Sequence, residues 1–123
     1  MDFKIDVERF ANDQVLVRVS GELDLSTSEE FEEIFKAVLN THPKLLIADL
    51  NNLTFINSHG MYVLLKAQFR LSQENGEIVI MGARPEIVVS LDLVGIPARI
   101  RCVSSLAEAQ VPPGKNHSCG SQV

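Results

Sequence analysis

Apolar and polar side chains alternate along the first part of the chain, with the period of strands that have one buried face. The alternation covers residues 3–8 and again residues 15–19, where Arg18 falls on the polar face. The short segment Ala11-Asn12-Asp13-Gln14 separates the two stretches. This pattern predicts a β-hairpin at the N-terminus.

A helical period begins after residue 25. Ser26 is followed three residues on by Glu29, the spacing of a capping box that closes the first turn of a helix. Apolar residues then recur every three or four positions until His42-Pro43 ends the helix; they are Phe31, Ile34, Phe35, Val38 and Leu39. The best-defined helix of the sequence is therefore predicted here.

The centre of the chain combines a short apolar run with a second helical period. Leu45–Ala48 is continuously apolar and ends at Asp49, as in a strand that helices bury on both faces. We expect the polar pair Asn51-Asn52 to form a loop and a second helix to begin near Ser58. That helix is predicted to stop at Asn75-Gly76, because these residue types tolerate the left-handed conformation.

Two further strands and two short helices are predicted toward the C-terminus. Residues 77–81 and 99–103 are rich in apolar and β-branched side chains. Between them, Pro85 is suited to the first position of a helix and Gly95 to its end. Residues 105–108, a serine followed three positions later by a glutamate, mark a final short helix.

The predicted order is β-β-α-β-α-β-α-β-α, a hairpin followed by strand-helix units whose crossovers should be right-handed. We therefore expect a single α/β domain over residues 1–110, with a mostly parallel, mixed β-sheet, an N-terminal hairpin and about four helices. Residues 111–123 lose both periodicity and apolar content and are predicted to form a flexible tail.

Composition narrows the class of protein. The 123 residues suit one domain, and the net charge of -5 disfavours binding to the phosphates of nucleic acid. The longest apolar stretch, Met61–Leu65, is far too short to cross a membrane, and the N-terminus does not resemble a signal sequence. We expect a cytoplasmic protein in which Cys102 and Cys119 form no structural disulfide.

The sequence contains few features of an enzyme. It lacks a Walker loop, a dinucleotide-binding glycine motif and a nucleophile elbow, and His42, His59 and His117 are not at metal-ligand spacing. Ser58 and His59 are neighbours, but adjacent side chains at a helix start diverge and do not form a catalytic dyad. We predict no catalytic residues, no metal and no cofactor.

Ser58 is the residue of greatest functional interest, and two interpretations apply to it. A hydroxyl at the start of a helix can be an N-cap that accepts a backbone N–H bond. The same position is also where a phosphate is best stabilised, because unpaired N–H groups and the positive end of the helix dipole face it. Ser58 is therefore either a cap or a phosphorylation switch.

At this junction the sequence resembles the STAS domain of bacterial anti-sigma factor antagonists. The resemblance covers about residues 3–110 and rests on the segments GELDLSTSEEF and DLNNLTFINSHGMYVLL, together with the order of elements. The family motif is a strand ending in Asp, a spacer and a serine-containing loop that opens a helix; the residues that match are Asp49, Phe55, Ile56, Ser58 and Gly60. The run from Gly21 to Asp24 matches the family's loop after the hairpin.

The resemblance implies a regulatory binding module. The unphosphorylated protein would bind an anti-sigma factor that is also a serine kinase with a histidine-kinase-like ATPase fold, and so release a sigma factor. Phosphorylation at Ser58 would weaken that binding, and a serine phosphatase would restore it. The implied partner surface comprises Glu22, Asp24, Leu25, Asn57, Ser58, His59, Gly60 and Met61, with Asp24 as the acidic residue near the phosphoacceptor.

Two residues depart from the family pattern. Asn57 stands where Asp is common, which removes a negative charge but keeps hydrogen-bonding capacity. His59 stands where Ser or Thr is common, and is either a pH-sensitive charge beside a phosphate or an exposed loop histidine with no such role. Both changes bear on the kinase partnership more than on the fold.

The alternative function is a STAS scaffold or accessory subunit, as in a stressosome or beside a lipid ABC transporter, whose surface docks without phosphate turnover. An enzyme with its own active site would need convergent titratable groups in a pocket. The acidity of the chain also suggests a partner surface with basic residues, complementary to Glu22 and Asp24.

Overall fold

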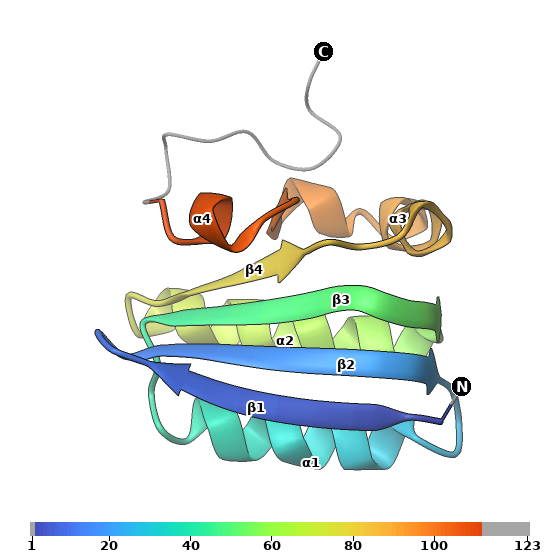
Figure 1. The fold of residues 1–123 in the computed structure, drawn as a ribbon, viewed down its shortest axis with the longest axis horizontal. Helices are drawn as coiled ribbons and strands as arrows, with labels where there is room; N and C mark the ends of the chain where they lie inside the picture. Colours follow the sequence, from blue (N-terminus) through green and yellow to red (C-terminus); the bar gives the residue numbers. More distant parts are fainter. Residues whose placement is uncertain (1, 112–123) are drawn as a thin grey trace.

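Five strands form one mixed sheet in which their spatial order equals their order in the chain (Figure 1). The structure is a computed structural model that describes residues 2–111. Strands β1 and β2 are antiparallel and all other neighbours are parallel, so the predicted hairpin and α/β order are confirmed. The elements are β1 (Lys4–Phe10), β2 (Gln14–Leu23), α1 (Ser28–Leu39), β3 (Leu45–Ile56), α2 (Ser58–Gln73), β4 (Glu77–Met81), α3 (Pro85–Leu93), the 3-10 helix η1 (Ile96–Ala98), β5 (Arg101–Val103) and α4 (Leu106–Ala109).

Most of the hydrophobic core lies between the sheet and the helices α1, α2 and α3. Strand residues of alternating position, such as Val17 and Ala48, face Phe31 and Phe35 of α1, whose rings are 4.6 Å apart. A smaller cluster on the other face of the sheet includes Ile47 and is covered in part by α4. Leu45–Ala48 is thus buried on both faces, as predicted from its continuous apolar run.

The sheet extends further than the side-chain pattern predicted. Asn51 and Asn52 were expected to form a loop but belong to β3, where the register with β2 shifts as at a β-bulge. The Asp49 carboxylate accepts the Asn51 N–H at 3.0 Å and supports this irregularity. Gly21, which the family resemblance assigned to a loop, belongs to β2. Its φ is 93°, and a Cβ there would lie 2.8 Å from the Asp2 carbonyl oxygen, so the conformation and the available space both favour glycine.

The capping box predicted at Ser26 is wrong. Helix α1 begins at Ser28 with Thr27 at the N-cap. The hydroxyl and N–H of Ser26 instead donate to the Asp24 carboxylate, at 2.8 and 3.0 Å. The reason is that Asp24 offers a stronger, charged acceptor two residues away, so a local turn replaces the cap.

The other predicted helix boundaries hold. Asn75 has a φ of 62° after α2, and Gly76 donates to the Leu71 carbonyl at 2.7 Å, a Schellman closure. Pro85 is the first residue of α3, and Ser105 caps α4. The last strand is shorter than predicted, because the N–H groups of residues 99 and 100 are used by η1. Residues 112–123 of the expected tail lie outside the described residues.

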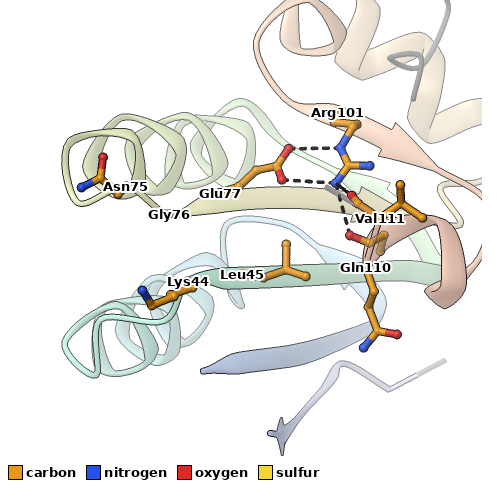
Figure 2. Close-up of a pocket in the computed structure, with 9 residues that line it drawn as sticks. Lys44, Leu45, Asn75, Gly76, Glu77, Arg101, Gln110 and Val111 are labelled. Atoms are coloured by element: carbon orange, nitrogen blue, oxygen red, sulfur yellow. Dashed lines mark hydrogen bonds and ion pairs between the residues drawn. The ribbon is translucent and has the colours of Figure 1, made fainter. Parts of the chain in front are cut away.

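Hydrogen bonds and an ion pair of the Arg101 side chain connect the C-terminal end of the domain to the sheet (Figure 2). Its side chain is only 8% exposed and makes a two-point contact with Glu77, with nitrogen–oxygen distances of 3.1 and 3.2 Å. The same guanidinium donates to the carbonyl oxygens of Glu108, Ala109 and Val111 at 3.0–3.2 Å. It therefore holds β4, β5 and the end of α4 together beside a hollow of about 210 Å³.

We predict that Arg101→Leu lowers the free energy of unfolding by about 2–3 kcal/mol, because Glu77 and three carbonyl groups lose a largely buried donor. Urea unfolding followed by circular dichroism measures the change. Arg84→Leu is the matched control, since its pair with Glu86 is exposed and should contribute less than about 1 kcal/mol. Equal losses in the two variants would contradict this role for Arg101.

Candidate functional site

The candidate site lies where β3 ends and α2 begins, and Asn57 is the residue that makes the connection. Its backbone is extended, and its side-chain Oδ1 accepts the N–H of Gly60 at 2.8 Å. Its own N–H donates to the Leu23 carbonyl at the end of β2, at 2.9 Å. Asn57 is thus the N-cap of α2, and the interpretation of Ser58 as the cap is wrong.

Ser58 occupies the first position of the helix and is exposed. Within residues 2–111 its hydroxyl makes no hydrogen bond, because the neighbouring asparagine already supplies the cap. The first turn of α2 contains no acidic residue. An added phosphate would therefore meet the positive end of the helix dipole without an opposing carboxylate in that turn.

Gly60 and Met61 lie inside the junction rather than on its surface. A Cβ at Gly60 would come within 2.5 Å of the Leu23 side chain, so the glycine lets the end of β2 pack directly on the first turn of α2. Met61 is only 9% exposed. Of the expected surface residues, these two support the site from behind, whereas Ser58 and His59 are exposed on it.

The segment that follows β2 is a structured turn with an apolar tip. The hydroxyl of Ser26, and to a smaller degree that of Thr27, donates to the Asp24 carboxylate, which lowers the pKa of Asp24. The single proton of the Thr27 hydroxyl is shared between this carboxylate, at 3.3 Å, and the nearer Glu22 carbonyl, at 2.8 Å. Leu25 stands at the tip with 89% of its surface exposed.

Phe55, one of the residues that match the family motif, is an exposed aromatic residue. It pairs in register with Glu22 across β2 and β3 and is 49% exposed. Both residues therefore lie at the strand ends beside the Ser58 junction. The apolar pattern alone could not identify it as exposed, because the bulge in β3 changes which residues face outward.

His59 lies in a helix, not in a loop, and its side chain contacts a carboxylate. It belongs to the first turn of α2, and its Nε2 lies 2.9 Å from one oxygen of Glu32 in α1. The other Glu32 oxygen accepts from the Lys66 ammonium at 3.0 Å. The lysine hydrogen bond, followed by that of the histidine, lowers the pKa of Glu32. The cluster joins α1 to α2 one residue away from Ser58.

We predict that Asn57→Ala destabilises the domain by about 1 kcal/mol through loss of the cap, while Asn57→Asp retains it. Ser58→Ala is the matched control and should change the free energy of unfolding by less than about 0.5 kcal/mol. Chemical denaturation of the three variants measures these effects. A larger loss in Ser58→Ala than in Asn57→Ala would show that the serine is the cap.

A second prediction concerns pH. Because the pKa of Glu32 lies below its ordinary value of 4.5 in the folded protein, its contribution to stability is present above that pH and is lost as pH falls through the lower folded value. The stability difference between the parent and Glu32→Gln should therefore shrink between pH 7 and pH 3. Glu33→Gln, at an exposed position beside it, is the control. A difference that does not vary with pH would contradict the ion-pair account.

Two kinds of feature are absent from residues 2–111, a membrane-spanning helix and a cluster of metal ligands. No helix in this range is long and apolar enough to span a membrane. The same range contains no group of three His, Cys, Asp or Glu side chains placed to hold a metal ion. Cys102 is buried in β5, whereas Cys119 and His117 lie outside the described residues, so the disulfide prediction stays untested.

Comparison with known proteins identifies the class to which this fold and junction belong. The family model of the STAS domain matches residues 4–109, and the chain belongs to that family. An anti-sigma F factor antagonist from Paenibacillus polymyxa is 28% identical over 116 residues, covering 90% of this chain and 98% of the relative.

Solved structures agree with this assignment. A crystal structure of an anti-sigma factor antagonist from Mycobacterium paratuberculosis has a TM-score of 0.79 and 26% identity, and the match covers 88% of this chain and 91% of that one. The anti-sigma factor antagonist SpoIIAA, solved in its unphosphorylated form, shares the fold with a TM-score of 0.75 at 19% identity over 86% of this chain and 92% of that one. SpoIIAA has also been solved in a phosphorylated form, with a TM-score of 0.68 over 86% of this chain and 96% of that one. The single α/β domain expected from the sequence is confirmed, and this chain is a member of the family that contains the antagonists of anti-sigma factors.

Proposed function

We propose that this chain is an anti-sigma factor antagonist that binds an anti-sigma factor when unphosphorylated and is switched off by phosphorylation of Ser58. The observation that carries the proposal is the division of roles at the start of α2. Asn57 caps the helix, and the Ser58 hydroxyl is exposed and makes no hydrogen bond among the described residues. A kinase can modify such a hydroxyl without removing the cap of the helix.

The proposed switch is electrostatic. A phosphate on Ser58 adds about -1.5 to -2 charges and three acceptor oxygens at pH 7. The first-turn N–H groups and the helix dipole stabilise that charge within the domain. A partner that docks on the unmodified surface would meet both the added charge and the added bulk, so its affinity should fall.

The proposed partner surface surrounds Ser58. It includes the exposed residues Glu22, Leu25 and His59 with the half-buried Asp24 and Asn57, while Gly60 and Met61 shape it from beneath. To these we add Phe55, because it is exposed and in register with Glu22. The mixture of acidic and apolar side chains suits a partner with basic residues around an apolar patch.

The proposed partners are an anti-sigma factor that is also a serine kinase with a histidine-kinase-like ATPase fold, and a serine phosphatase that reverses the modification. In this proposal the domain acts in the cytoplasm as a substrate and binding module, without an active site or a cofactor. The names of its relatives support regulation rather than catalysis.

Phosphorylation by the cognate kinase and ATP tests the proposal directly. The parent protein should gain the mass of one phosphate, and Ser58→Ala should gain none. Ser72→Ala is the matched control, since it removes an exposed serine from the other end of the same helix. Labelling of Ser58→Ala as strong as that of the parent would overturn the assignment. Stable co-purification with an ATPase subunit and no phosphorylated species would favour the scaffold alternative instead.

A further inference from the structure

Helix α2 has a second apolar face, on the side turned away from the sheet. Tyr62, Leu65 and Phe69 recur at spacings of three and four residues, so they line one side of the helix. Tyr62 and Phe69 are 55% and 63% exposed, whereas the core-facing Leu64 and Leu71 are fully buried. The Tyr62 ring lies under the Lys66 ammonium, 5.2 Å from the ring centre, and beside the His59 ring, whereas Phe69 makes no such ring contact among the described residues.

These rings border a groove between the two helices. Lys36 and Leu39 of α1 line one wall, around a volume of about 520 Å³. The other wall is formed by five residues of α2, which are Tyr62, Leu65, Lys66, Phe69 and Arg70. Leu39 is only 6% exposed and Leu65 is partly buried, so the groove has an apolar floor. It is suited to an apolar side chain inserted from outside.

The rim of the groove is cationic, although the chain as a whole carries a charge of -5. Lys36, Lys66 and Arg70 stand around it. Lys66 and Arg70 are paired with Glu32 and Glu74, and Lys36 has no ion-pair partner among residues 2–111. Of the three rim cations, Lys36 alone is therefore without a carboxylate partner among the described residues.

We infer that this groove, which we call the α1–α2 groove, docks an amphipathic helix that carries apolar anchors flanked by acidic residues. The unpaired Lys36 would attract the acids. Tyr62 and Phe69, about 10 Å apart along the helix axis, would contact anchors two turns apart. A protein helix fits better than an anionic membrane, since the surface is concave and the negative net charge of the domain opposes a lipid surface of the same sign.

The Phe69 end of this groove lies away from the proposed phosphorylation site, whereas Tyr62 is one helical turn after Ser58 and its ring is 6.2 Å from that of His59. Phe69 follows Ser58 by eleven residues, which corresponds to about 16 Å along α2. The inference therefore does not depend on the Ser58 switch. An antagonist with both surfaces could hold one partner at the junction and a second acidic segment at the groove.

The test uses a fluorescent synthetic peptide of about 16 residues, four helical turns, with Leu and Phe on one face and Glu on the other. Fluorescence anisotropy with the full chain should give saturable binding. Phe69→Ser and Lys36→Glu should each weaken it by roughly tenfold, as expected when an aromatic anchor or a facing charge is lost. Leu93→Ser, which removes a still more exposed apolar residue from α3, should leave the affinity unchanged.

Several results would overturn the inference. One is the absence of saturable binding by the acidic peptide, and another is equal binding by the same peptide with Lys in place of Glu. Self-association in sedimentation that Phe69→Ser abolishes would assign the groove to a second copy of the chain. Binding to vesicles with phosphatidylglycerol that Phe69→Ser abolishes would assign it to a membrane surface.

Discussion

The contact between Asn57 and the end of β2 is the constraint on which the functional end of the domain depends. One residue donates to the Leu23 carbonyl through its N–H and accepts the Gly60 N–H through its side chain. These two bonds fix where the helix starts relative to both long parallel strands. Gly60 makes the arrangement possible, because any larger residue would collide with Leu23. Ser58 is consequently presented outward at a defined place.

The opposite end of the sheet is stabilised by the contacts of a different side chain, that of Arg101. Arg101 joins the start of β4 to the carbonyl groups at the end of α4 through a largely buried guanidinium. The Ser58 junction is fixed by its own contacts, of Asn57 with Leu23 and of His59 with Glu32, and Arg101 adds stability at the other end of the sheet. A domain divided in this way can accept a phosphate at one end while its fold remains supported from the other.

The order of elements could be predicted from the sequence because it depends on the pattern of apolar residues. The periodic residues Phe31, Phe35 and Val38 of α1 are buried, and so is the continuous run Leu45–Ala48. The residue that caps α2 could not be predicted from the sequence, because Asn57 and Ser58 are adjacent and both residue types cap helices well. Ser26 was misassigned because the competing acceptor, Asp24, lies outside the motif. The hydrogen bond between His59 and Glu32 joins residues 27 positions apart, so no local sequence pattern could predict it. The groove could not be predicted either, because it depends on how α1 packs beside α2.

The central claim is that phosphorylation of Ser58 blocks a partner without disturbing the helix that presents the serine. Titration calorimetry with the same anti-sigma factor, comparing the unphosphorylated and phosphorylated proteins, tests it when paired with amide NMR spectra of both forms. The account predicts an affinity at least tenfold weaker for the phosphorylated form, while the Gly60 amide remains hydrogen-bonded and the core resonances stay in place. Equal affinities, or a loss of affinity accompanied by melting of the first turn of α2, would contradict it.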